Sequence, residues 1–246
     1  MLRNFEFSFA EYYHGYNRGV DKRPIFLDKG DYERFVKLLY VSNSKQRFNF
    51  SDTFGKQANV TLVDIDRGEK LVDIGAWCLM PNHFHLLLKE KLEDGPRGEF
   101  SGISLFMKKL LTAYSMYFNT KYHRKGALFE GRFKAKHLDY DQYLKYQYTY
   151  IHLNPIGIID KGWKKKEISN KEKAKKFLKE YKYSSYKDYV GEEREENAIL
   201  NKEAFPEYFS TKIDFEDMII EWVNFDIGGV SELGAEILRP DLDNVG

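Results

Sequence analysis

Two apolar segments separated by a short break constrain the fold of this chain more than any other feature. Residues 71–79 and 83–89 are both rich in apolar side chains, and Met80, Pro81 and Asn82 lie between them. So short a connection predicts a β-hairpin, and Pro81 favours the turn because proline cannot donate to a strand ladder. The pair therefore predicts two neighbouring antiparallel strands.

Alternation within the second segment places two histidines on one side of the predicted strand. Successive side chains of a strand point to opposite faces, so His83 and His85 share one face while Phe84 and Leu86 share the other. One face can pack against a core while the other holds a metal ion. Two histidines on a strand are weak evidence by themselves, because hydrogen-bonded surface histidines are common. The remaining histidines are interpreted as structural residues: His14, His123, His137 and His152.

The segments around the hairpin complete an α+β pattern. Residues 9–18 are aromatic and predict a first strand, and the helical spacing of apolar side chains over residues 31–40 predicts a helix. An amphipathic helix over 103–118, a strand over 133–138 and a helix over 141–153 follow. This order predicts a ferredoxin-like β-α-β-β-α-β unit with one added helix. We expect an antiparallel sheet with helices on one face and an open face available to a ligand.

Charge divides the chain into two parts. Residues 191–246 contain 15 acidic and 4 basic residues, a net charge of −11, which leaves +12 for residues 1–190 out of a total of +1. We therefore predict a domain over 1–190 and an acidic C-terminal appendage over 191–246, with small helices between residues 199 and 227. A basic domain suits a polyanion because neutralising phosphates releases condensed counterions, although a lysine-rich solvated surface explains the same charge.

Composition limits the class of protein. The 246 residues are 42% hydrophobic and can bury a full core, and residues 60–65 are apolar enough to predict a short extra strand. Cys78 is the only cysteine, so neither an intramolecular disulfide nor a cysteine zinc cluster can form. No apolar run reaches the roughly 20 residues of a membrane span, and residues 1–9 lack the apolar centre of a signal peptide. We expect a soluble cytoplasmic protein.

A tyrosine-rich segment ends the helix that is predicted over residues 141–153. Residues 150–155 read Tyr-Ile-His-Leu-Asn-Pro, and in a helix Tyr150 and Asn154 are i and i+4 neighbours, with Pro155 marking the helix end. Hydroxyl and amide can then approach the same ion. The helical spacing of Tyr143, Tyr146 and Tyr150 is by itself typical of core packing, so spacing alone does not identify a reactive tyrosine.

Four segments, in this order, resemble the single-tyrosine HUH transposases, and most closely their REP-associated branch. They are residues 12–19, 78–88, 128–135 and 150–155, and residues 183–186 resemble the segment that follows the catalytic helix of that family. The resemblance implies the HUH endonuclease fold and a metal-dependent endonuclease and strand transferase. Such an enzyme acts on single-stranded DNA, often beside a hairpin, and passes through a 5′-phosphotyrosine intermediate.

The resemblance also implies roles for individual residues. Tyr150 matches the nucleophile, and His83, His85 and Asn154 match the ligands of a divalent metal, Mg²⁺ or Mn²⁺. A shift in register would move the nucleophile to a neighbouring tyrosine, at 146 or 148. Basic side chains are expected to position DNA phosphates. These candidates are Arg18, Lys121, Arg124, Lys125, Arg132, Lys134 and Lys136.

Two other functions are compatible with the same residues. A domesticated module could bind DNA hairpins without cleaving them, and would then need the basic face but no competent metal site. A plasmid relaxase or replication initiator would keep the chemistry in another context, but such enzymes commonly show different surrounding motifs. The sequence leaves open whether the protein is a monomer or a homodimer.

Overall fold

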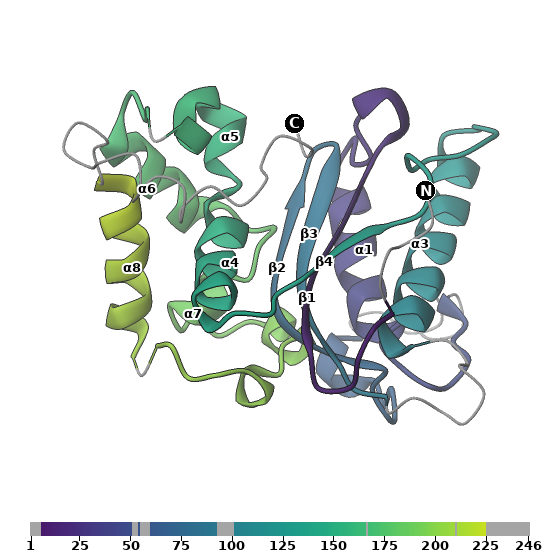
Figure 1. The fold of residues 1–246 in the computed structure, drawn as a ribbon. Coiled ribbons are helices and arrows are strands. Elements are labelled where there is room, and N and C mark those ends of the chain that lie inside the picture. The colour runs from purple at the N-terminus through teal and green to yellow at the C-terminus, as the bar shows by residue number, and fades with distance from the viewer. Residues whose placement is uncertain are drawn as a thin grey trace.

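A four-stranded antiparallel sheet lies at the centre of the molecule, with strand order β2-β3-β1-β4 (Figure 1). The computed structural model describes residues 6–50, 54, 60–92, 101–165, 167–209 and 211–224. The strands are β1 (Tyr12–Arg18), β2 (Val72–Met80), β3 (His83–Glu90) and β4 (Lys134–His137). The α-helices are α1 (Lys29–Val41), α3 (Gly102–Lys121), α4 (Asp141–Leu153), α5 (Ile156–Ile159), α6 (Lys171–Glu180), α7 (Tyr186–Tyr189) and α8 (Lys212–Asn224). The 3₁₀ turns are η1 (Val20–Lys22), η2 (Leu62–Asp64), η3 (Lys161–Lys165), η4 (Glu195–Ile199) and η5 (Lys202–Ala204).

The element order confirms the predicted α+β unit. Strands β2 and β3 form the expected hairpin, with Met80 opposite His83 and Val72 opposite Glu90. Strand β1 lies between β3 and β4 and is antiparallel to both. This arrangement places β1 beside the histidine-bearing strand although about 65 residues separate them in the chain.

Helices α1 and α3 cover one face of the sheet, and side chains of the neighbouring segments cap both helices. Helix α1 begins at a capping box in which Asp28 and Asp31 each accept a hydrogen bond from the backbone N–H of the other. Helix α3 begins beside the buried Glu90 carboxylate, which accepts the N–H groups of Gly102 at 2.9 Å and Ile103 at 3.1 Å. The core beneath these helices combines aliphatic side chains with aromatic ones that include Phe35, Phe84, Phe106 and Tyr114.

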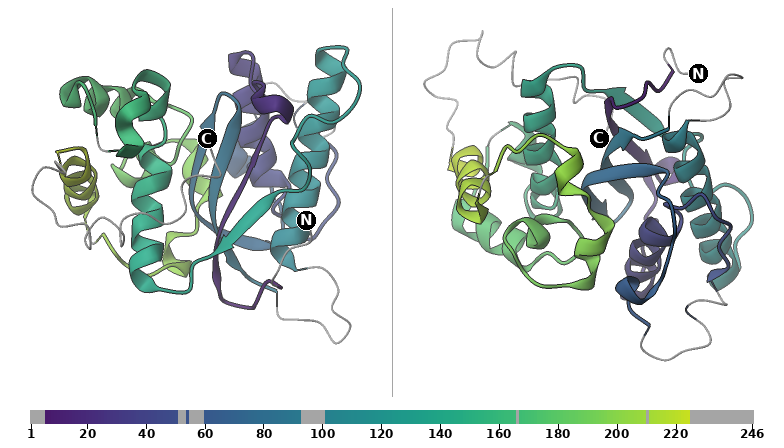
Figure 2. Two further views of the ribbon diagram at one scale, coloured as in Figure 1. Left: turned by 45° about the horizontal axis from the view of Figure 1, so that its top comes forward. Right: turned by 90° about the horizontal axis from the view of Figure 1, so that it is seen from below.

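Helix α4 covers the opposite face of the sheet, so the face that the sequence predicts to be open to a ligand is occupied by this helix. Leu144, Tyr148 and Ile151 of α4 join a second core with Cys78 of β2 and Leu87 of β3. The apolar stripe of α4 needs a partner surface, and the apolar side chains of β2 and β3 on this face provide it. Figure 2 shows the sheet between the two groups of helices, with α6 and α8 outside α4.

One further expectation differs from the structure. The strand predicted over residues 60–65 is wrong, because Thr61 and Asp64 cap each other and close the 3₁₀ turn η2. Within the predicted C-terminal appendage, Ile199 packs in the first core and Phe215 in the second. Residues 225–246 of that appendage lie outside the described residues. None of the helices in the described ranges is long and apolar enough to cross a membrane.

Candidate functional site

Strand β3 presents both predicted histidines to the face that α4 covers. Phe84 and Leu86 point into the α1/α3 core, so the alternation predicted from the sequence is present in the structure. His85 is fully buried, His83 is partly exposed, and their ring centroids lie 5.0 Å apart. The two imidazoles are therefore neighbours at the end of β3 next to the hairpin turn.

A hydrogen bond orients the His83 ring. Its Nδ1 lies 2.6 Å from Oδ1 of Asn82, whose Nδ2 donates to the Lys22 carbonyl at 3.1 Å. The second bond fixes the orientation of the Asn82 amide, so Oδ1 faces the histidine as an acceptor. His83 consequently carries its proton on Nδ1 and keeps a lone pair on Nε2.

His14 of β1 contacts the second predicted ligand. Its Nε2 lies 2.8 Å from Nδ1 of His85, and the two rings are nearly parallel, with centroids 5.0 Å apart. Sequence reasoning assigned His14 a structural role and missed this contact. The signal was the alternation of the first strand, which places His14 and Tyr16 on one face, combined with the topology that puts this strand beside the hairpin.

Tyr150 of α4 packs against this histidine pair. Its ring centroid lies 5.5 Å from that of His85 and 6.0 Å from that of His14, both in edge-to-face geometry. The rings of Tyr146 and Trp163 lie at 6.3 and 5.8 Å from Tyr150. The Tyr150 hydroxyl and His85 Nε2 are both buried, and neither has a hydrogen-bond partner among the described residues.

Burial keeps the reactive groups of this site uncharged. It raises the pKa of Tyr150 well above its ordinary value of 10, and the neighbouring Asn154 amide, which favours the phenolate, offsets this only in part. Burial lowers the pKa of His14 to about 3 and that of His83 to about 4. The pKa of His85 is lowered as well, again mainly by burial. All three imidazoles are therefore neutral at pH 7, the state in which an imidazole can bind a metal ion.

Two cations add a positive potential at the histidines. Lys164 of η3 lowers the pKa of His83 and of His85, and Arg18 of β1 lowers that of His83, in each case as a smaller effect than burial. Sequence reasoning selected Arg18 but not Lys164, which lies in a lysine-rich stretch where no pattern distinguishes one residue from the next. A positive potential here suits a phosphate group.

Asn154 lies at the end of α4, as the sequence predicts. Its Nδ2 donates to the Tyr150 carbonyl at 2.7 Å, which confirms the i, i+4 relation. Within the described ranges, no group of three His, Cys, Asp or Glu side chains is placed to hold a metal ion. A metal bound to the two histidines of β3 would therefore need a ligand of another type, such as an amide oxygen.

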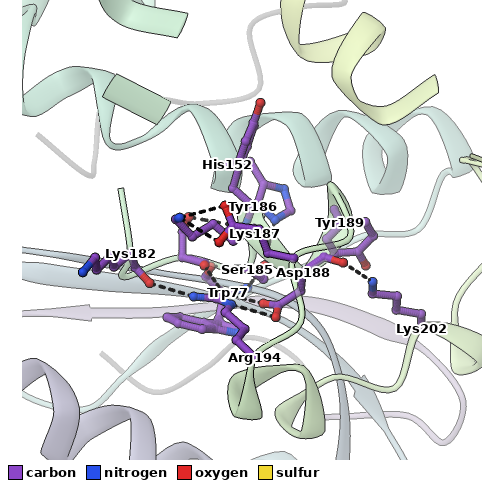
Figure 3. Close-up of polar contacts among 12 residues, drawn as sticks. Trp77, His152, Lys182, Ser185, Tyr186, Lys187, Asp188, Tyr189, Arg194 and Lys202 are labelled. Carbon is purple, nitrogen blue, oxygen red and sulfur yellow. Dashed lines mark hydrogen bonds and ion pairs between the residues drawn. The ribbon is translucent and has the colours of Figure 1, made fainter. Parts of the chain in front are cut away.

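A buried polar network holds α4 against the sheet (Figure 3). His152 donates from Nδ1 to the Tyr148 carbonyl at 2.8 Å, so its Nε2 accepts the hydroxyl of Ser185 at 2.7 Å. The Ser185 hydroxyl in turn accepts the backbone N–H of Trp77 in β2 at 3.0 Å. Residues 183–186 thus connect the edge of β2 to the helix that carries Tyr150, which supports a structural role for His152.

Two of the predicted DNA-binding residues form ion pairs. Arg18 binds the exposed carboxylate of Glu130, with Nη2 donating to Oε1 at 3.2 Å. The Lys121 ammonium contacts Asp28 at 2.8 Å and the buried Asp31 at 2.7 Å. Lys121 therefore connects the end of α3 to the start of α1, a role that needs no DNA.

The five other predicted basic residues are either exposed to solvent, close to an aromatic ring or on the same face of the sheet as the histidines. Lys136 is opposite His14 and Lys134 is opposite Tyr16 in the β1–β4 pairing. Both lysines therefore lie on the face of the sheet that carries His14, His83 and His85, which we call the histidine face. The Arg124 guanidinium lies 5.5 Å from the centroid of the Phe118 ring. The exposed members of the set are Lys125, Arg132 and Lys134.

Comparisons with known proteins give one similar solved structure to report. No family model matches the sequence, and no curated protein shows significant similarity to it. The similar structure is described as a REP-associated tyrosine transposase bound to a REP hairpin. It has a TM-score of 0.47 and 14% sequence identity, and the match covers 77% of this chain and 85% of that one.

Proposed function

We propose that this protein is a metal-dependent endonuclease and strand transferase for single-stranded DNA, with Tyr150 as its nucleophile. The main support is the contact between His85 and Tyr150, whose rings lie 5.5 Å apart although 65 positions separate them. Each presents a buried polar atom without a partner in the described chain. Since about nine in ten buried polar groups are hydrogen-bonded, two unpaired reactive atoms in contacting rings indicate a ligand site.

The proposal includes a divalent cation, which is supported by the buried His85 Nε2, unpaired among the described residues. His83 Nε2, His85 Nε2 and the Asn154 amide oxygen would hold it. Two neutral imidazoles and an amide oxygen, completed by water, are compatible with Mg²⁺ or Mn²⁺. A cation bound here would polarise the scissile phosphate and offset the charge that develops during the reaction.

Tyr150 would supply the covalent step. Its hydroxyl oxygen bonds to the phosphorus and loses its proton, while the bond from phosphorus to the 3′ oxygen breaks and that oxygen becomes a free 3′-hydroxyl. The product is a 5′-phosphotyrosine, which another 3′-hydroxyl can attack to rejoin strands without ATP. Burial raises the pKa of Tyr150 further above neutral, so the hydroxyl is protonated before the attack and must lose its proton in this step. The hydroxyl is also shielded from solvent, so the side chains that bury it must move to admit the phosphate.

Basic side chains would position the DNA strand along the histidine face. Lys134 and Lys136 share this face through their pairing with β1. Arg18 and Lys164 contribute positive potential at His83. Phosphate contacts of this kind set the position of the strand without reading its sequence.

Covalent capture of DNA tests the proposal. The protein is incubated with Mn²⁺ and end-labelled, hairpin-forming single-stranded DNA from the region around its gene, and denaturing gels are searched for a labelled adduct. We expect an adduct that EDTA prevents and that Tyr150→Phe abolishes. Tyr146→Phe is the matched control, because it removes a hydroxyl from the neighbouring ring of the same helix and should still give the adduct.

Two results would contradict the proposal. An adduct retained by Tyr150→Phe would remove the assignment of the nucleophile. Tight hairpin binding without any adduct, in Mg²⁺ or Mn²⁺ and on several hairpins, would identify the protein as a binding module that does not cleave.

A further inference from the structure

The contact between His14 and His85 determines which nitrogen of His85 carries the proton. Because His85 is a proposed metal ligand, this inference rests on the proposed function. His14 Nε2 lies 2.8 Å from His85 Nδ1, and both rings are buried, at 5% and 0% exposure. This contact uses Nε2 of His14 and Nδ1 of His85, and the ring planes are nearly parallel. His85 can therefore offer only Nε2 to a ligand.

Two proton arrangements satisfy this hydrogen bond. Both rings are neutral because their surroundings exclude water, so one nitrogen of the pair donates and the other accepts. If His14 donates, His85 carries its own proton on Nε2. If His85 donates from Nδ1, its Nε2 keeps a lone pair.

The surroundings of His85 Nε2 distinguish these arrangements. The atom is buried and has no partner among the described residues. A proton there would be a buried donor without an acceptor, whereas a lone pair there is ready to bind a cation. Metal-binding histidines commonly donate from their second nitrogen to a neighbouring acceptor, which fixes the proton and the ring.

We propose that His14 is a positioning residue that accepts the Nδ1 proton of His85 and so keeps His85 Nε2 free for the divalent cation. The same arrangement holds the other histidine of β3, since His83 Nδ1 lies 2.6 Å from the Asn82 amide oxygen. Acceptors from two different segments thus direct both Nε2 lone pairs. His14 itself is not a metal ligand in this arrangement.

The position of the proton can be measured without metal or DNA. Long-range ¹H–¹⁵N NMR of the metal-free protein distinguishes a histidine protonated at Nδ1 from one protonated at Nε2. We expect His85 to be protonated at Nδ1 in the wild type and in His14→Gln, whose amide oxygen can accept the same proton. In His14→Phe, which keeps a ring but no acceptor, we expect this preference to be lost. A wild-type His85 protonated at Nε2 would overturn the inference, whether or not any variant folds.

Metal affinity gives the second readout. Mn²⁺ binding is followed by EPR in the Tyr150→Phe background, where no DNA chemistry can occur. We expect His14→Phe to weaken binding by about 10- to 100-fold and His14→Gln to restore most of it. Tyr16→Phe is the matched control, because this ring stacks on His14 at 5.0 Å but makes no hydrogen bond to His85. Circular dichroism melts verify that each variant is folded.

The two readouts separate failure of this inference from failure of the proposed function. Wild-type affinity in a folded His14→Phe variant would overturn the role of His14 while leaving the metal centre in place. A wild-type protein that binds no Mn²⁺ would overturn the metal centre. In that case the NMR measurement still decides whether His14 sets the proton on His85.

Discussion

Buried ionisable groups on the two faces of the sheet differ in how completely they are hydrogen-bonded. On the α1/α3 face, Asp31 accepts the backbone N–H of Leu27 and the hydroxyl of Tyr122, both at 2.7 Å, and Glu90 accepts the first N–H groups of α3. On the α4 face, His85 and Tyr150 each keep an unpaired polar atom. In the part of the chain that the structure describes, the unpaired buried atoms near α1 and α3 are Trp77 Nε1 and Asn119 Oδ1, which belong to side chains that do not ionise.

This difference separates groups that stabilise the fold from groups available for chemistry. A buried carboxylate at a helix start stabilises the native state through the N–H groups that it accepts. A buried hydroxyl or imidazole nitrogen without a partner costs stability and is retained where a ligand completes its bonding. The comparison therefore predicts different effects of mutation on the two faces, and a loss of stability on the α4 face at a higher pH than on the α1/α3 face.

Acid should destabilise the α4 face most, and this is the largest expected effect. Burial lowers the pKa of His14 and of His152 to about 3, below the value of 6.5 expected in the unfolded chain. The unfolded state therefore takes up protons first, and stability falls as the pH falls below 6.5. Each of these two histidines should remove about 2 kcal/mol between pH 6.5 and 5, and His85 acts in the same direction. Nearby cations reinforce the shifts: Lys136, Lys164, Arg194 and Lys202.

Urea unfolding of the metal-free protein at pH 7 and pH 5 measures this loss. Hydrogen exchange should show α4 losing protection before α1 and α3. In His14→Gln the pH dependence should weaken by about one proton, or about 1.4 kcal/mol per pH unit. Equal stability at the two pH values would contradict the difference between the faces.

On the α1/α3 face, removal of a capping carboxylate should lower stability and leave the proposed reaction of Tyr150 with DNA unchanged. Glu90→Ala leaves the buried N–H groups of Gly102 and Ile103 without acceptors, and we expect a loss of about 3 kcal/mol in the free energy of unfolding. Urea denaturation measures the loss. Glu203→Ala removes an exposed glutamate of η5 and should change stability by less than about 0.5 kcal/mol. A Glu90→Ala variant as stable as this control would mean that the carboxylate does not hold the start of α3.

A pair of tyrosine substitutions compares the faces with one chemical change. The Tyr114 hydroxyl donates to the Ile25 carbonyl at 2.6 Å in the α1/α3 core, so Tyr114→Phe should cost about 1 kcal/mol of stability. The Tyr150 hydroxyl makes no hydrogen bond of good geometry within the described ranges, so Tyr150→Phe should leave stability within about 0.5 kcal/mol of wild type or raise it. Thermal and urea unfolding measure both. A larger loss in Tyr150→Phe would show that its hydroxyl is hydrogen-bonded in solution.

Local patterns predicted most of the fold, and non-local packing explains what they missed. The hairpin, the helix over 141–153 and the face shared by His83 and His85 follow from periodicity and a short turn, which involve only neighbouring residues. The placement of α4 on the second face depends on which surface accepts its apolar stripe. The spacing of residues within one segment carries no information about that surface.

The candidate site shows the same division. The tyrosine spacing did not distinguish Tyr150 from Tyr146, and only the motif resemblance selected it. The His14–His85 contact depends on the register between β1 and β3, which pairs Tyr16 with His85 and brings His14 to a diagonal position. Positive charge alone does not separate Lys121, which is held by two aspartates, from Lys134, which is exposed, and only the motif resemblance over residues 128–135 favours Lys134.

Substitution of these two lysines should give the smallest effects, and it is the most selective test of the difference between the two faces. Lys134 lies on the histidine face opposite Tyr16, so Lys134→Ala should weaken hairpin binding a few-fold and reduce the salt dependence of log K by about 0.7. Lys121→Ala should leave that salt dependence unchanged and lower stability by about 1 kcal/mol, because the buried Asp31 loses its cation. Fluorescence anisotropy with a labelled hairpin at several salt concentrations, together with urea unfolding, measures both effects. An equal change in salt dependence for the two variants would mean that DNA also engages the α1/α3 side, and the division between a structural and a functional face would then fail.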